Sequence, residues 1–418
     1  MEAQQESKFS DHWIVKLIEQ SNYNPQKNLL VRMYAECKKT NVRPKLNSFS
    51  INGKKYLLLE DDNVKLVFGD DYNSLFLKKE QFGLPCGFFQ RWGKTIEDDP
   101  QFSPIGPEIL DLEISVNGCP PVGNGGNCKF CYKNNTNSPP TNMSFDTFKT
   151  IIDKIPSTLT QVAFGITGVQ TNPDFIRMME YCRTKGIIPN FTLSGADLTD
   201  ELADIISKLA GAVAVSCYES DKNVCYNTIQ KFTSRGMKQV NIHIMVSEET
   251  LPFVYEVVKN RINDPRLSKM HAIVFLGIKP KGRAKGKFHS VNTEEYSKLI
   301  KTCLDNSLVF GFDSCSAPKF QNSLGSLNFK DERLQKMIEF SEPCESDLFS
   351  SYINVFGEFW HCSFSENEEG QESIDVLKAN DFLQDVWYSG VVNKFRQKSI
   401  ESGVNGCRKC TVFPEINN

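Results

Sequence analysis

The chain has 418 residues, of which 40% are hydrophobic and 24% are charged. This balance supports a sizeable core and excludes a disordered or collagen-like chain. Forty-eight Lys and Arg against 51 Asp and Glu give a net charge of −3, so no overall basic charge indicates nucleic-acid binding. No apolar run approaches the ~20 residues that span a bilayer, and the polar start lacks a signal-peptide pattern. We therefore expect a cytoplasmic protein without membrane contact.

Residues 1–105 predict a small α+β accessory domain. The predicted elements are helices over residues 11–20 and 29–39, two strands joined at Asn52-Gly53, a further strand over residues 63–68 and a linker over residues 83–107. Asn-Gly suits a type I′ hairpin turn because both central residues need a positive φ. The hairpin edge offers a surface for strand addition by a peptide, although support of the next domain is the preferred interpretation.

Residues 106–316 alternate between strand and helix patterns. Strands are predicted over residues 109–116, 161–167, 188–193, 211–217, 239–246, 270–278 and 310–313, and helices over residues 145–155, 173–185, 198–209, 223–234, 251–262 and 293–306. Ser144 is the expected N-cap of the first helix. Repeated strand–helix units give parallel strands covered by helices. We therefore predict an α/β fold, a partial (β/α)6 barrel of the TIM type.

Residues 317–418 do not continue the alternation of strand and helix patterns, and this change predicts a separate C-terminal domain. A hairpin is expected over residues 352–360, with its turn at Gly357, and an acidic loop follows at 366–372. The apolar residues show too little periodicity for a rich core. A bound metal would therefore help to stabilise this region.

The chain contains fourteen cysteines, and they are the most informative feature of its composition. In a cytosolic protein, metal ligation explains them better than disulfides. Seven stand alone, where a small buried hydrophobe is the default interpretation. The other seven gather in two sets: Cys119, Cys128 and Cys131, and then Cys344, Cys362, Cys407 and Cys410.

The first cysteine set follows the first barrel strand, at the end of a barrel where active sites lie. Three thiolates on a Gly-rich loop suit an iron–sulfur cluster and would leave one iron of a four-iron cluster open. A zinc site is the alternative, but no nearby fourth ligand is present, because no His follows within thirty residues.

This motif resembles the C-x3-C-x-φ-C motif of the radical S-adenosylmethionine (radical SAM) family, in which φ is aromatic; here φ is Phe130. The first gap has eight residues instead of three, and they include Gly, Asn and Pro, which can loop out. The resemblance covers residues 108–316. It implies a [4Fe–4S] cluster on Cys119, Cys128 and Cys131, with SAM bound to the open iron.

The resemblance also implies SAM contacts at the ends of later strands. In relatives, a Gly-Gly-Glu-like turn after the second strand contacts the amino group of SAM, and residues 167–170 take its place here. Ser194 and Ser216 stand where relatives contact the ribose and the carboxylate of SAM. The alternative for residues 167–170 is a plain strand–helix turn, and for the two serines ordinary helix caps. For Arg283 it is a solvated basic loop over residues 277–287. The expected contact residues are Phe130, Thr167, Gly168, Val169, Gln170, Ser194, Ser216 and Arg283.

The second cysteine set has the pattern C-x12-G-x4-C, followed by Cys407-x2-Cys410. Four thiolates can close a tetrahedral site, so structural zinc is an alternative. The pattern resembles the twitch form of the SPASM auxiliary-cluster domain found in radical SAM enzymes. This resemblance implies a second, auxiliary [4Fe–4S] cluster held by all four cysteines.

Two candidate catalytic residues, Cys315 and Asp313, stand at the end of the last barrel strand, which faces the active-site mouth. Cys315 has three candidate roles: a substrate-side thiol, a hydrogen donor or a cluster ligand. A buried structural cysteine is the preferred alternative. Asp313 and Glu219 are candidate bases.

The resemblance implies a radical SAM oxidoreductase, in which a 5′-deoxyadenosyl radical abstracts a substrate hydrogen. An auxiliary cluster that accepts an electron favours net oxidation or crosslinking of a peptide, protein or small molecule. Implied partners are such a substrate and an electron donor such as flavodoxin or ferredoxin. The alternative is a non-catalytic zinc or iron–sulfur binding module.

Overall fold

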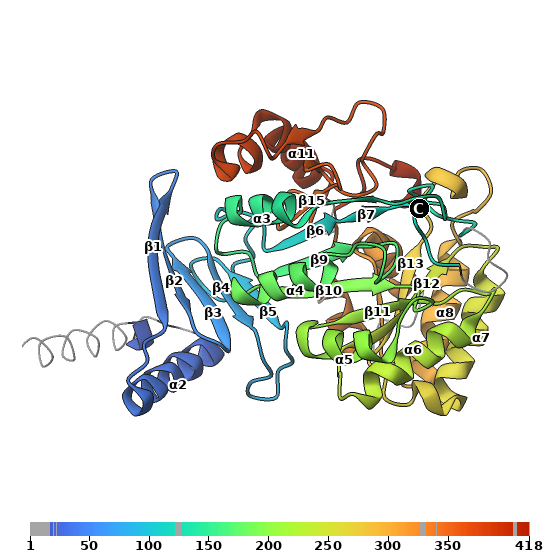
Figure 1. Ribbon diagram of the computed structural model, residues 1–418, viewed down its shortest axis with the longest axis horizontal. Coiled ribbons are helices and arrows are strands. Elements are labelled where there is room, and N and C mark those ends of the chain that lie inside the picture. The colour runs from blue at the N-terminus through green and yellow to red at the C-terminus, as the bar shows by residue number, and fades with distance from the viewer. Residues whose placement is uncertain are drawn as a thin grey trace, which may run out of the picture. The chain divides into compact units, whose positions relative to one another are not determined.

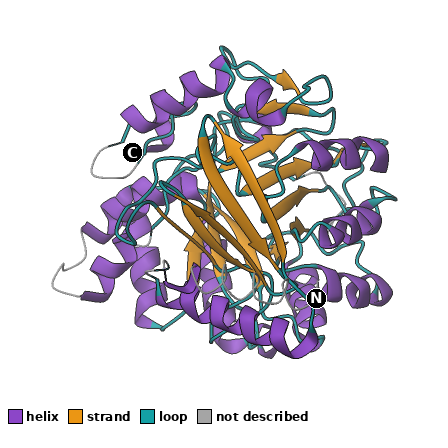
Figure 2. Cartoon of the chain, turned by 90° about the vertical axis from the view of Figure 1, so that its left-hand side faces the viewer, coloured by secondary structure: helices purple, strands orange, loops and turns teal. Residues whose placement is uncertain are grey.

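The computed structural model describes residues 17–19, 21, 23–121, 128–325, 332–339, 341–403 and 408–417. The chain divides into two compact units, residues 1–108 with 157–160 and residues 109–156 with 161–418. Helices and strands occur in both units (Figures 1 and 2). A separate domain that begins at residue 317 stays a prediction. The predicted helix over residues 11–20 lies mostly outside the described residues.

The first unit is a five-stranded antiparallel sheet in the order β1-β2-β3-β4-β5 with helix α2. Asn52 and Gly53 have φ values of 51° and 80°, which confirms the predicted hairpin turn. Strands β4 and β5 were not predicted, and β5 lies within the predicted linker, because such short strands depend on their sheet neighbours. The elements are α2 (Asn24–Thr40), β1 (Lys45–Ile51), β2 (Lys54–Glu60), β3 (Val64–Gly69), β4 (Asn73–Leu77) and β5 (Phe89–Trp92).

The second unit is built on a ten-stranded sheet in the order β14-β13-β12-β11-β10-β9-β6-β15-β16-β17. Strands β6 and β9 to β14 run parallel, as predicted for a partial barrel. Their bounds are β6 (Ile109–Glu113), β9 (Gln161–Gly165), β10 (Ile188–Leu193), β11 (Val213–Ser216), β12 (Val240–Val246), β13 (Ile273–Gly277) and β14 (Phe310–Phe312). A short pair, β7 (Ser115–Val116) and β8 (Thr141–Asn142), follows β6.

Helices connect these strands and bury their apolar stripes, as the sequence predicts. Ser144 caps the first of them, because its side chain accepts a hydrogen bond from the backbone N–H of Thr147. The helices are α3 (Phe145–Lys154), α4 (Phe175–Thr184), α5 (Asp200–Leu209), α6 (Lys222–Ser234), α7 (Leu251–Asn263) and α8 (Thr293–Asp305).

The C-terminal part extends the same sheet, since β15 pairs in parallel with β6 (Figure 1). The expectation of a poor core was wrong, because Leu348, Phe359, Val386 and Trp387 are all buried. A turn, a short strand and a π-helix carry these residues, so no regular period marks them. The elements are α9 (Ala317–Gly325), α10 (Glu332–Glu339), β15 (Ser350–Ile353), β16 (Glu358–Trp360), β17 (Ile374–Asp375), the π-helix Phe382–Trp387 and α11 (Gly390–Glu401).

Candidate active site and metal centres

The first cysteine set lies on the loop after β7, beyond the carboxyl end of β6. Residues 122–127 are outside the described residues, so the looping-out of the long first gap stays a prediction. Backbone hydrogen bonds hold the rest: Cys119 N–H donates to Thr136 O (3.0 Å) and Cys131 N–H to Cys128 O (3.3 Å). All three cysteines therefore belong to one loop at the carboxyl edge of the sheet.

The segment after β13 supports this loop. Arg283 donates from Nε to Cys128 O (2.8 Å), from Nη2 to Asn135 O (2.7 Å) and from its backbone N–H to Cys131 O (3.0 Å). Its guanidinium therefore holds the backbone of the cysteine loop, a positioning role that sequence reasoning did not foresee. The SAM contact implied for Arg283 stays a prediction.

We expect Gly282→Ala to displace the cysteine loop and to remove about half of the bound iron after anaerobic reconstitution. Gly282 has a φ of 59°, and an added Cβ would lie closer than 3.0 Å to the backbone oxygens of Cys131 and Tyr132. Gly286→Ala is the matched control, because its φ of 70° imposes similar strain but its Cβ would meet nothing within 4 Å. Equal iron contents in the two variants would contradict this role.

Burial acts against free thiolates in this loop. It raises the pKa of Cys119, and it raises the pKa of Cys128 to about 11. These two thiols are therefore neutral near pH 7 unless a bound cation stabilises their anions. Soft thiol donors that need such a cation fit a metal centre, which is consistent with the predicted ligand role.

The predicted SAM turn, Thr167, Gly168, Val169 and Gln170, follows β9 and is held by Asp197. Gln170 N–H donates to Asp197 Oδ2 (2.9 Å), and the Gln170 side-chain amide donates to Asp197 O. A Cβ on Gly168 would lie closer than 3.0 Å to Asp197 Oδ2. The Val169 side chain is buried, so only the backbone of this residue is available for a contact with SAM. Sequence reasoning missed Asp197, because an Asp before a helix looks like an ordinary cap.

The other predicted SAM contacts lie on the same edge of the sheet. The Phe130 and Tyr218 rings lie nearly parallel, with centroids 6.2 Å apart. Ser194 follows β10, and its Oγ accepts from a backbone N–H two residues on, as in an ordinary turn. Ser216 ends β11. The strand ends thus bring these residues to the edge that carries the cysteine loop, while their contacts with SAM stay predictions.

The second cysteine set joins the hairpin to the end of the chain. Arg408 Nε donates to Cys344 O (2.9 Å), which ties the segment before Cys410 to the segment before β15. Burial raises the pKa of Cys362 to about 12, and the Cys344 thiol adds to this. Burial also raises the pKa of Cys410. Cys407 lies outside the described residues, so the four-cysteine ligand set stays a prediction.

Asp313 is engaged by its neighbours. It pairs with Lys279, and accepts hydrogen bonds from Gly277 N–H (3.1 Å) and the Ser316 hydroxyl. Cys315 lies in the 3-10 turn Ser314–Ser316 and lines a cavity of about 20 Å³, room for one water molecule. Burial raises the pKa of Cys315 well above its usual value, so the thiol is neutral. Catalytic roles for Cys315 and Asp313 stay predictions.

The remaining acidic candidates are exposed. Glu219 lies on the loop after β11. In the described ranges, one group of three side chains has ligand atoms within 4.8 Å of one another: Glu248, Glu249 and His289, all exposed. His289 pairs with Glu249 (2.6 Å), and we assign no site to this surface pair.

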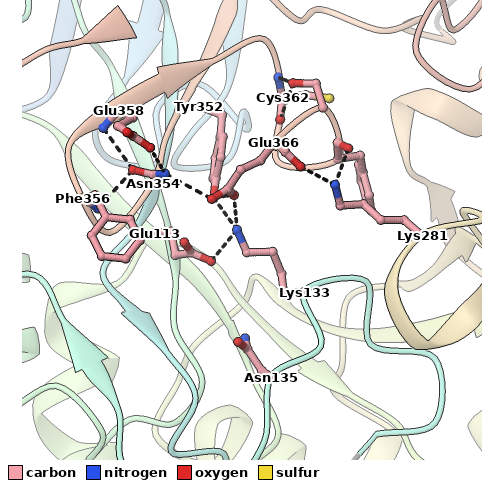
Figure 3. A network of polar contacts seen from close by, with 12 residues as sticks. Glu113, Lys133, Asn135, Lys281, Tyr352, Asn354, Phe356, Glu358, Cys362 and Glu366 are labelled. Atoms are coloured by element: carbon pink, nitrogen blue, oxygen red, sulfur yellow. Dashed lines mark hydrogen bonds and ion pairs between the residues drawn. The ribbon is translucent and has the colours of Figure 1, made fainter. Parts of the chain in front are cut away.

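A buried polar network links the two cysteine regions (Figure 3). Lys133, two residues after Cys131, pairs with Glu113 at the end of β6 (3.0 Å) and with Glu366, four residues after Cys362. The three charged side chains are only 7–11% exposed. Tyr352 on β15 accepts from Lys133 Nζ and donates to Glu366, both at 2.9 Å. The network fixes the cysteine loop to the segment after the second hairpin strand.

None of the described helices is long and apolar enough to cross a membrane.

Comparisons with known proteins identify the fold. No family model and no curated protein matches the chain. Streptococcus suis SuiB matches with a TM-score of 0.54 and 14% identity, over 74% of this chain and 77% of SuiB. SuiB bound to precursor peptide SuiA gives 0.54 and 15%, over 75% and 71%. anSMEcpe with bound AdoMet (SAM) and Cp18Cys peptide gives 0.52 and 14%, over 74% and 88%. These matches confirm the predicted fold.

Proposed function

We propose that this chain is a radical SAM enzyme that modifies a peptide. Cys119, Cys128 and Cys131 would hold a [4Fe–4S] cluster, which together with SAM supplies the 5′-deoxyadenosyl radical that abstracts a substrate hydrogen. The observation that carries the proposal is the braced three-cysteine loop at the carboxyl edge of a partial barrel. The fold shared with SAM-bound SuiB and anSMEcpe supports it.

The residues of this chain would position the reactants. Arg283 holds the backbone of the cysteine loop, so the loop keeps one geometry while SAM binds. Asp197 fixes the turn 167–170, whose backbone would accept the SAM ammonium. Phe130 and Tyr218 supply apolar ring surface that excludes water from this edge.

The finer reaction follows from the second cysteine set. Cys344, Cys362, Cys407 and Cys410 would hold an auxiliary [4Fe–4S] cluster with no open position, which suits electron transfer and therefore net oxidation or crosslinking. A peptide substrate is supported by the SuiB structure bound to precursor peptide SuiA and the anSMEcpe structure with Cp18Cys peptide. An electron donor such as flavodoxin or ferredoxin completes the proposal, with a cytoplasmic location that keeps these thiols reduced.

Anaerobic reconstitution of the full chain tests the proposal. We expect about eight irons per chain and 5′-deoxyadenosine formation that requires SAM and a strong reductant. Bound zinc without iron, and no 5′-deoxyadenosine, would assign the chain to the alternative class, a metal-binding module without catalysis.

We expect the double variant Cys344→Ala with Cys410→Ala to keep part of its SAM cleavage but to lose about 2 kcal/mol of stability. A cluster on these cysteines would tie the segment of Cys410 to the hairpin, whereas the apolar core around Trp387 keeps the rest of this region folded. Thermal unfolding and iron analysis measure the effect. Cys37→Ala on α2 is the control and should change neither quantity. If the double variant keeps the melting temperature and the iron content of the wild-type protein, the second set binds no metal.

A further inference from the structure

The two faces of the parallel sheet differ sharply in accessibility. Successive side chains along a strand point to opposite faces. Those on the helix-covered face are fully buried, for example Leu110, Leu112, Val162, Val213 and Ile242. Many of those on the opposite, inner face are half-buried or exposed, although Tyr352 and Ala214 are buried; the open positions are Asp111, Ala163, Gly165, Asn190, Thr192 and His243. Side chains fill the interior of a complete barrel, so this inner face is unusually open.

Asp111 stands in the middle of this inner face. Its strand, β6, lies between β9 and β15, and Asp111 is in register with Ala163 on one side and Tyr352 on the other. Ala163 and the next inner residue of β9, Gly165, are too small to cover the carboxylate. Asp111 is therefore exposed to solvent although it is recessed, and burial by the surrounding protein raises its pKa to about 6.

Among the described residues, the Asp111 carboxylate has no counter-ion. In the described part of the chain it forms no hydrogen bond or ion pair. The ammonium of Lys133 is engaged by Glu113 and Glu366, and the Tyr352 hydroxyl donates to Glu366 (Figure 3). An ionised carboxylate in a recess is costly unless a positive charge compensates it.

His243, another titratable group on this face, does not supply that charge. His243 on β12 lies half-buried beside Thr192, whose Oγ1 is 3.3 Å from His243 Nδ1. Burial lowers the pKa of His243 to about 4, although Asp313 acts in the opposite direction, so the imidazole is neutral near pH 7. The inner face thus combines one uncompensated negative charge with neutral polar groups.

Asp111 lies close to the first cysteine set. The strand that carries Asp111, β6, leads at its carboxyl end through β7 into the loop of Cys119, Cys128 and Cys131. A group bound at Asp111 would therefore lie near the loop that holds the proposed cluster.

We propose that the inner face binds a cationic group of the substrate, the side chain of a lysine or arginine in a peptide, with Asp111 as its counter-ion. This inference rests on the proposed function and names the substrate class for that site. An ammonium or guanidinium at Asp111 would form the charge-assisted hydrogen bonds that the protein itself does not provide.

Calorimetric titration of the cluster-loaded full chain tests the site without SAM. The probes are the peptides acetyl-Ala-Lys-Ala-amide and acetyl-Ala-norleucine-Ala-amide, which differ essentially by the ammonium. We expect wild-type protein to bind the lysine peptide at least about tenfold more tightly, and Asp111→Asn to abolish this preference. Glu180→Gln on the outer face of α4 removes an exposed carboxylate and should leave the preference intact.

Equal binding of the two peptides by wild-type protein would overturn the inference without any variant, so a folding defect in Asp111→Asn cannot hide the result. A lysine preference that Asp111→Asn retains would also overturn it. SAM cleavage is measured on the same preparation. Protein that cleaves SAM but shows no preference would reject the cation site alone, whereas absent SAM cleavage would reject the proposed function.

Discussion

Replacing Cys119, Cys128 and Cys131 together by Ala is expected to abolish 5′-deoxyadenosine formation and to remove about half of the iron. The three residues share one braced loop, and Ala has no donor atom, so the triple variant loses every thiolate that this loop could offer to a cluster. Iron analysis and chromatographic detection of 5′-deoxyadenosine, both on anaerobically reconstituted protein, measure the two effects.

The matched control for the triple variant is Cys37→Ala, which removes a thiol from α2, in the first unit. It should keep full iron content and full SAM cleavage. Continued 5′-deoxyadenosine formation by the triple variant would disprove the ligand assignment of this loop. If the triple variant loses activity but keeps all its iron, other residues bind the cluster, and the defect lies in the shape of this loop.

The strand–helix repeats of the second unit could be predicted closely because local periodicity specifies them. The strand predicted over residues 188–193 is β10 itself, and Ser144 caps α3 as its sequence position indicated. Apolar residues with a period near 2 or 3.6 record which face of an element is buried, and capping residues record where a helix starts. The Asn52-Gly53 turn was predictable for the same reason: its backbone demand is local.

Features that depend on distant partners were not predictable. β15 joins the sheet beside β6, although more than 200 residues separate them, and nothing within β15 specifies that neighbour. β5 is a strand because β4 pairs with it. The C-terminal core was underestimated because its apolar residues lie on a turn, short strands and a π-helix without a regular period.

The candidate site divides in the same way. The cysteines could be found because motif spacing is a sequence property. The residues that hold the loops could not, since Asp197, Gly282 and Lys133 act through contacts formed only in the folded chain. Lys133 and Glu366 are 233 residues apart in the sequence. Asp111 looked like a polar residue in an amphipathic strand until the openness of the inner face was known.

We expect Lys133→Met to destabilise the protein by about 3–5 kcal/mol, since it removes the one cation that Figure 3 shows between Glu113 and Glu366. Met preserves most of the volume, so the loss reports on charge more than on packing. Two nearly buried carboxylates would remain without their counter-ion. Denaturant unfolding at pH 7.5 measures the change.

Lys149→Met is the control, because its ion pair with Asp153 is exposed to solvent and its loss should cost little stability. The cost of Lys133→Met should shrink as the pH falls. Burial already raises the pKa of Glu113 against the opposing effect of Lys133, and loss of Lys133 raises it further. A carboxyl group with a raised pKa in the folded state binds its proton more readily there, so acid relieves the unpaired charge. A cost below about 1 kcal/mol, or one that grows toward pH 5, would show that the network does not hold the two cysteine regions together.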